Sequence, residues 1–196
     1  MAPLAVVSAL SFLALAAIAR TQHVFSLDYT AQALVQGGRH PLLESPMRAL
    51  TLLGSGWVLA ALSVLGWLGL RRLGHPLARF VPATVVGAFL LDVLTKWLVS
   101  RPRPRGTEYG FPSGHTLGAV IFLGAVVYVL WTSGVPRVPR WLGTLLACVL
   151  VLGVAWSRLY LKVHWLSDVL GGLTGGLAYL LVALLVIDRR VRSATE

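Results

Sequence analysis

Long uncharged stretches of apolar residues dominate this sequence and restrict the folds that are open to it. A helix needs about 20 apolar residues to cross the ~30 Å hydrocarbon core of a bilayer, because each residue adds ~1.5 Å. Runs without a charged residue lie at 1–19, 49–70, 116–136, 141–157 and 169–187. A further run, 80–100, is interrupted only by Asp92 and Lys96. We therefore predict an all-α integral membrane protein, a bundle of six transmembrane helices.

The composition and the backbone chemistry of a bilayer both favour this class. Charged residues make up 12% of the 196 residues, whereas soluble domains carry about 25%. Helices satisfy their own backbone hydrogen bonds in lipid. We expect a single membrane domain, 1–196, and an interfacial loop or amphipathic helix at 21–48. The expected spans are approximately 3–19, 50–70, 80–100, 116–132, 141–157 and 168–187.

The first apolar run admits a second interpretation. Ala17-Ile18-Ala19 resembles a signal-peptidase site at the end of an apolar stretch of suitable length. No Lys or Arg precedes that stretch, which argues against cleavage. We expect a first transmembrane span here, and the sequence leaves open whether it is cleaved.

The distribution of cations gives an expected orientation. Six spans place both termini on one side of the membrane, together with Arg71, Arg72, Arg79, Arg137, Arg140, Arg189, Arg190 and Arg192. The opposite side carries Arg20, Arg39, Arg48, Arg101, Arg103, Arg105, Arg158 and Lys162. If Arg103 and Arg158 belong to a site, eight cations stand against six. The positive-inside rule then favours cytoplasmic termini in an inner (plasma) membrane.

The net charge of +10 restricts the kinds of partner that the protein is expected to bind. No basic stripe with interleaved aromatic residues is present, so no nucleic-acid partner is expected. The remaining partners are the anionic headgroups of the bilayer and an anionic substrate. The sequence has no His-Glu-x-x-His motif, no paired cysteines and few clustered carboxylates. We therefore expect no metal and no cofactor; the oligomeric state is not predicted.

Three short motifs stand at the edges of the apolar runs. Lys96 to Arg103-Pro104 ends the third expected span, and Pro112-Ser113-Gly114-His115 begins the fourth. Ser157-Arg158, followed by His164 and Asp168, joins the fifth span to the sixth. In an up-and-down bundle these four helix ends face the same side. We expect the motifs to meet in one pocket at the outer membrane–water interface, facing the periplasm or exterior.

Together the three motifs resemble the signature of the type-2 phosphatidic acid phosphatase family. The resemblance covers roughly residues 50–187, and no signature position departs from it. It implies a six-helix membrane enzyme that removes a phosphate from a lipid without a metal. Family substrates include undecaprenyl diphosphate, phosphatidylglycerophosphate and phosphatidic acid, and the short chain favours a cell-envelope lipid.

The residue types suit phosphate binding on their own terms. Phosphoryl transfer requires positioning of the group and stabilisation of charge on its oxygens. Arg103 and Arg158 offer planar bidentate forks and Lys96 a point charge. Ser113 and Gly114 stand at a helix start, where free N–H groups and the helix dipole favour an anion, and Ser113 can also cap that helix.

The two histidines are expected to have different roles. His164 and Asp168 are four residues apart, so on a helix they share one face and can hydrogen-bond. The carboxylate then fixes the imidazole tautomer and leaves Nε2 free, which predicts His164 as a nucleophile that forms a phosphohistidine. His115 fits the general acid that protonates the leaving alcohol and then the base that activates water.

Several residues around the motifs are expected to play supporting parts. Asp92 is one helical turn from Lys96 and is expected to pair with it. Four glycines after Asp168 predict close packing of the last helix; these are Gly171, Gly172, Gly175 and Gly176. Three further cations are expected at the rim, as headgroup contacts; these are Arg101, Arg105 and Lys162.

Two alternatives to a lipid phosphatase remain open from the sequence. A phosphohistidine also permits transfer to another lipid or a sugar, and the sequence does not reveal an acceptor pocket. A non-catalytic lipid-binding or transport bundle is the other alternative, and it would require the site to be inactive.

Overall fold

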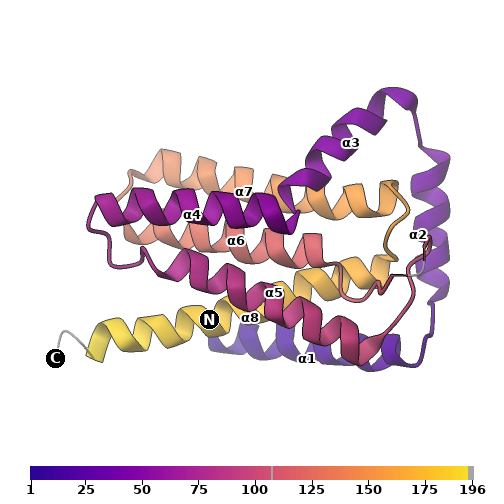
Figure 1. Ribbon diagram of the computed structural model, residues 1–196, viewed down its shortest axis with the longest axis horizontal. Coiled ribbons are helices and arrows are strands. Elements are labelled where there is room, and N and C mark those ends of the chain that lie inside the picture. Colours follow the sequence, from indigo (N-terminus) through magenta and orange to yellow (C-terminus); the bar gives the residue numbers. More distant parts are fainter. Residues whose placement is uncertain (107, 194–196) are drawn as a thin grey trace.

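The chain folds into a helical bundle with an additional helix across one end (Figure 1). The computed structural model describes residues 1–106 and 108–193, with 188–193 described by their backbone. Within these residues it contains eight helices and no named strand. They are α1 (Ala2–Arg20), α2 (Ser26–Gly37), α3 (Pro41–Leu53), α4 (Gly56–Arg72), α5 (Phe80–Val99), α6 (Gly114–Thr132), α7 (Arg137–Tyr160) and α8 (Leu166–Ser193).

The expected all-α membrane bundle is confirmed. In the described part of the chain, α1, α5, α6, α7 and α8 are each long and apolar enough to cross a bilayer. The pair α3 and α4 meets the same test as one span bent by 53°. Large apolar side chains on the outside of α7 are exposed, as lipid contact requires; they include Leu142, Leu145, Leu146, Val149 and Leu152. The protein is a multi-pass membrane protein.

The second span differs from the expected continuous helix at 50–70. Helix α3 ends at Leu53 and α4 begins at Gly56. Two glycines flank Ser55 at this bend, and glycine is a poor helix former. Tertiary packing also fixes the bend, because a Cβ on Gly54 would come within 2.8 Å of the His115 carbonyl oxygen.

The expected interfacial segment, 21–48, forms α2 and the first part of α3, and α2 lies across the end of the bundle where α5 ends and α6 begins (Figure 1). Two glutamines of α2 fasten it there. Gln32 donates to the Leu159 carbonyl at 3.1 Å, and Gln36 donates to the Tyr160 carbonyl at 3.1 Å. The last carbonyls of a helix have no partner within it, so α2 completes the hydrogen bonding of α7.

Helix α6 is the centre of the bundle. It packs against α3, α4, α5, α7 and α8, and its side chains Leu117, Ile121 and Ala125 are buried. These residues repeat every four positions along one stripe, which is the spacing of a buried helix face. The first turn of α6 is therefore held from several sides, which is where the motif Pro112 to His115 lies.

Glycines on α8 allow it to approach two neighbours closely, as expected. A Cβ at Gly172 would lie 2.7 Å from the Ser113 carbonyl oxygen, and one at Gly176 would lie 3.0 Å from that of Leu117. Gly171 and Gly175 face aromatic rings instead; these belong to Phe111 and Phe12. Glycine is required on both faces because the neighbouring atoms occupy the space of a side chain.

The contact at Gly172 can be tested by adding one methyl group. Gly172→Ala should lower the free energy of unfolding by about 1–3 kcal/mol, because the new Cβ meets a backbone carbonyl that cannot rotate away. Gly66→Ala in α4 is the matched control, since nothing lies within 4 Å of a Cβ there. The control should be neutral or stabilising. Thermal unfolding in detergent measures both; equal melting temperatures would contradict the close contact.

Candidate active site

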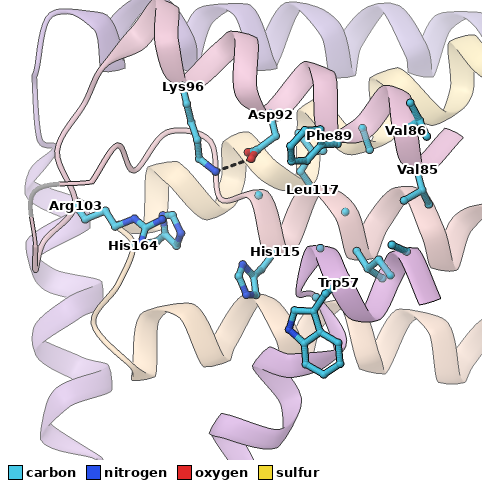
Figure 2. Close-up of a pocket in the computed structure, with 17 residues that line it drawn as sticks. Trp57, Val85, Val86, Phe89, Asp92, Lys96, Arg103, His115, Leu117 and His164 are labelled. Carbon is cyan, nitrogen blue, oxygen red and sulfur yellow. Dashed lines mark hydrogen bonds and ion pairs between the residues drawn. The ribbon is translucent and has the colours of Figure 1, made fainter. Parts of the chain in front are cut away.

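One cavity of about 570 Å³ lies among α4, α5, α6 and three connecting segments. Figure 2 shows its two different ends. The polar end carries Asp92, Lys96, Arg103, His115 and His164, and the apolar end is lined by side chains of α4, α5 and α6. The apolar lining includes Trp57, Ala60, Val85, Val86, Phe89 and Leu117. Such a cavity suits a ligand with a charged head and an apolar tail.

The structure brings most of the expected site residues to this one cavity. Lys96, Arg103, Gly114, His115 and His164 line it, although they come from three separate sequence motifs. The remaining three, Ser113, Arg158 and Asp168, are buried and are not part of the lining.

Lys96 and Asp92 form the expected ion pair, with 2.6 Å between Nζ and Oδ2. The Asp92 carboxylate also lies against the start of α6, because a Cβ on Gly114 would be 2.7 Å from either of its oxygens. A carboxylate is stabilised at the positive end of a helix dipole. Asp92 therefore sits at the point where the cation and the helix N-terminus both attract negative charge.

Arg103 is oriented by a short loop after α5. The loop folds back so that the Arg103 backbone N–H donates to the Glu108 carbonyl at 3.2 Å. The guanidinium forms an ion pair with the Glu108 carboxylate. Its Nε also donates to the Tyr109 carbonyl at 3.3 Å. These contacts direct the planar head of Arg103 to the cavity (Figure 2).

Arg158, in the last turn of α7, does not line the cavity but is close enough for its charge to lower the pKa of His164. It is 6% exposed, and its Nη1 donates to the hydroxyl of Thr51 on α3. Helix α3 thus supports a cation of the expected phosphate site. No motif in the sequence pointed to this segment of the second span, so Thr51 was missed.

Ser113 differs from its expected capping role. It occupies the N-cap position of α6, but its side chain makes no bond to the backbone of that helix. Its hydroxyl instead lies 3.0 Å from the Thr116 hydroxyl, and its backbone N–H donates to the Asp168 carbonyl at 2.9 Å. Among the described residues the first turn of α6 has no side-chain cap, which leaves N–H groups for an anion.

His164 stands in the turn before α8 and Asp168 in its first turn. The two residues therefore meet across a helix start, and the expectation that both lie on one helix is wrong. His164 Nδ1 is 3.5 Å from Asp168 Oδ2, beyond the usual hydrogen-bond range of about 2.7–3.2 Å. The same Oδ2 accepts from the Trp165 N–H at 2.9 Å, so Asp168 also satisfies the start of α8.

The surroundings of His164 favour a neutral imidazole. The side chain is 1% exposed. Burial lowers the pKa of His164 well below its ordinary value, and the positive charges of Arg158, Arg103 and Lys96 lower it further. A neutral imidazole keeps a lone pair, which a nucleophile or a base requires.

Arg101 is the residue that sequence reasoning placed wrongly. It was expected at the rim with Arg105 and Lys162, which are exposed, but its side chain is 1% exposed. It lies within 3.2 Å of Asp28 and within 3.3 Å of Asp168. No local pattern distinguishes Arg101 from Arg105, because the acidic partner Asp28 is 73 positions away in the chain.

The fold and this cationic, two-histidine cavity define a membrane-embedded phosphatase that acts on lipids. The family model of the PAP2 superfamily matches residues 77–192. The chain belongs to the PAP2 superfamily.

Individual relatives agree with this assignment. Phosphatidylglycerophosphatase B of Bacillus subtilis (strain 168) is 31% identical over 178 residues, covering 86% of this chain and 87% of that protein. An undecaprenyl-diphosphatase of Sulfolobus acidocaldarius is 36% identical over 110 residues, covering 52% of this chain and 49% of that protein. The crystal structure of a transmembrane PAP2-type phosphatidylglycerolphosphate phosphatase from Bacillus subtilis superposes with a TM-score of 0.83 at 26% identity, covering 94% of this chain and 96% of that one.

The lowered pKa of His164 predicts how stability depends on pH. Below about pH 6.5 the unfolded chain protonates this histidine while the folded chain does not. Stability is therefore highest above pH 6.5 and falls as the pH decreases, by up to about 1.4 kcal/mol per pH unit from this group. His164→Asn should flatten the decrease between pH 7 and pH 5, measured as melting temperature in detergent. Parallel curves for the two proteins would contradict a buried, neutral His164.

Proposed function

We propose that this protein hydrolyses the phosphomonoester or diphosphate of a membrane lipid through a phosphohistidine on His164. The observation that carries the proposal is the convergence of Lys96, Arg103, His115 and His164 on one cavity whose other end is apolar. Separate cations or separate histidines have many explanations in a membrane protein. Their meeting beside a lipid-sized apolar lining has the chemistry of a phosphorylated lipid.

The lipid phosphate binds between the cations and the start of α6. Lys96, Arg103 and Arg158 stabilise the charge on the phosphoryl oxygens. The N–H of Gly114, at the start of α6, adds a hydrogen bond from the positive end of the helix. The phosphate and the Asp92 carboxylate compete for the Lys96 ammonium group. When the phosphate binds, the ion pair between Lys96 and Asp92 therefore weakens.

The reaction proceeds in two phosphoryl transfers. Nε2 of His164 attacks phosphorus and forms a P–N bond while the bond to the leaving oxygen breaks. His115 protonates that oxygen, and the lipid alcohol or lipid monophosphate departs. His115 then takes a proton from water, which attacks phosphorus and breaks the P–N bond. Inorganic phosphate leaves and His164 returns to its neutral state.

The apolar end of the cavity receives the part of the lipid next to its phosphate. Ala60 on α4 and Val86 and Phe89 on α5 line this end. All three are exposed on the outside of the bundle as well. A lipid can therefore keep its tail in the bilayer while its head reaches the cations, which limits the desolvation cost of binding.

The substrate is a phosphorylated cell-envelope lipid of the kind that the relatives' names give. Candidates are undecaprenyl diphosphate, phosphatidylglycerophosphate and phosphatidic acid. The excess of arginines on the side of the termini supports cytoplasmic termini in an inner (plasma) membrane. The site then faces the periplasm or exterior.

Replacement of the nucleophile tests the proposal directly. His164→Ala should reduce phosphate release by at least about 10⁴-fold, and His115→Ala by about 10²–10⁴-fold. The assay is phosphate release from dioctanoyl phosphatidic acid, phosphatidylglycerophosphate and farnesyl diphosphate in detergent. His23→Ala is the control, since His23 is exposed and outside the cavity. Unchanged turnover in His164→Ala would refute the phosphohistidine mechanism.

Narrowing the apolar end tests the position of the lipid. Ala60→Phe should reduce kcat/KM for a long-chain phosphatidic acid by about tenfold or more, because the ring occupies the space of the tail. Hydrolysis of a short soluble phosphate ester should change much less. Ala61→Phe is the matched control, because Ala61 is an exposed neighbour that does not line the cavity. Equal loss for both substrates would place the tail elsewhere.

A further inference from the structure

A group of buried charged residues stands directly behind His164, outside the cavity. The Arg101 cluster consists of Arg101, Asp28, Ser167 and Asp168, none of which is more than 4% exposed. It joins α2, the loop after α5 and the start of α8. Only Asp168 of this cluster belongs to the family motif that the sequence contains, so the other three residues require a separate explanation.

The Asp28 carboxylate is the most fully bonded member. Its Oδ1 accepts from the Ser167 N–H at 2.7 Å, and its Oδ2 accepts from the Ser167 hydroxyl at 2.8 Å. Oδ2 also accepts from Arg101 Nη2 at 3.2 Å. Asp28 is therefore held in place by hydrogen bonds to both of its oxygens.

The guanidinium of Arg101 contacts two carboxylates. Nη2 bonds to Asp28, whereas Nη1 lies 3.3 Å from Asp168 Oδ1 and donates to the Ser167 hydroxyl at 2.8 Å. The other oxygen of Asp168, Oδ2, faces His164. One carboxylate thus connects Arg101 on one side to the imidazole on the other.

The charges of the cluster sum to −1, from one guanidinium and two carboxylates. When His164 is phosphorylated, its imidazole ring carries a charge of +1. The ring and the cluster together then have a net charge of zero. Charges that are fixed in advance in a dry environment stabilise such a developing charge without reorganisation. The cations Lys96, Arg103 and Arg158 lie on the phosphate side of His164 and oppose a positive ring. The Arg101 cluster is the negative counterpart behind it.

We infer that Arg101 and Asp28 are positioning residues for the nucleophile, an inference that rests on the proposed role of His164. Arg101 keeps Asp168 ionised in a buried position, where an unpaired carboxylate is costly. Asp28 balances Arg101, so that the charge of Asp168 remains available to the imidazole. Helix α2 is by this inference part of the catalytic apparatus, because it supplies Asp28.

The net charge yields a test in which two defects offset each other. Arg101→Gln leaves two buried carboxylates that share one proton, so Asp168 carries only part of the negative charge. Asp28→Asn lets Arg101 neutralise Asp168. Each single variant should slow the phosphorylation of His164 by about 10–100-fold. The double variant keeps Asp168 as the one acid of the cluster, so the whole charge of −1 lies on the carboxylate that faces His164. It should react about tenfold faster than Arg101→Gln.

The measurement is the rate at which His164 is phosphorylated by phosphoramidate, a small donor that releases ammonia, followed by mass spectrometry of the protein in detergent. Rates are expressed per folded molecule, with folding checked by melting temperature. Turnover of dioctanoyl phosphatidic acid is measured in parallel, where kcat should fall and KM should change little. Arg105→Gln, an exposed cation of the same loop, is the matched control.

The outcomes separate this inference from the proposed function. If wild-type His164 is neither phosphorylated nor needed for turnover, the nucleophile assignment fails and the inference fails with it. If wild type reacts and the single variants match it, only the inference is overturned. A double variant no faster than Arg101→Gln would also overturn it, because two independent defects in positioning do not offset each other.

Discussion

The close approach of α8 to the first turn of α6 is the contact on which the site depends. Gly172 lies against the Ser113 carbonyl, and the Ser113 N–H donates to the Asp168 carbonyl at 2.9 Å. This backbone contact joins the motif that contains His115 to the motif that contains Asp168. A side chain at position 172 would separate the helices, and with them the two histidines. The precision of the site thus comes from two helix starts in direct contact.

The cations of the site are held by partners of unequal strength. Lys96 has the Asp92 carboxylate and Arg103 has that of Glu108, whereas Arg158 bonds to the neutral hydroxyl of Thr51. A carboxylate offsets the charge of its partner, and a hydroxyl only orients it. Arg158 therefore retains the most uncompensated charge near His164, and of the three cations it lowers the pKa of His164 the most.

Sequence reasoning predicted what depends on local pattern and missed what depends on distant partners. Run length and charge gave the membrane bundle, and the order of helix ends gave the meeting of Lys96, Arg103, His115 and His164. The position of Arg101 could not be predicted, because its burial depends on Asp28 in another helix. The capping expectation for Ser113 failed for a local reason, since the Ser113 hydroxyl pairs with the Thr116 hydroxyl three residues along the chain.

The bend between α3 and α4 is the last element that the site requires. Thr51, before the bend, supports Arg158 on α7, and Trp57, after it, lines the cavity beside His115. The 53° bend directs α3 along α7 and α4 along α5 and α6, so Thr51 and Trp57 face different neighbours. Gly54 makes the bend possible by letting the chain touch the backbone of His115. The bend in this span therefore places Thr51 where it supports a cation of the site and Trp57 where it lines the apolar end of the cavity.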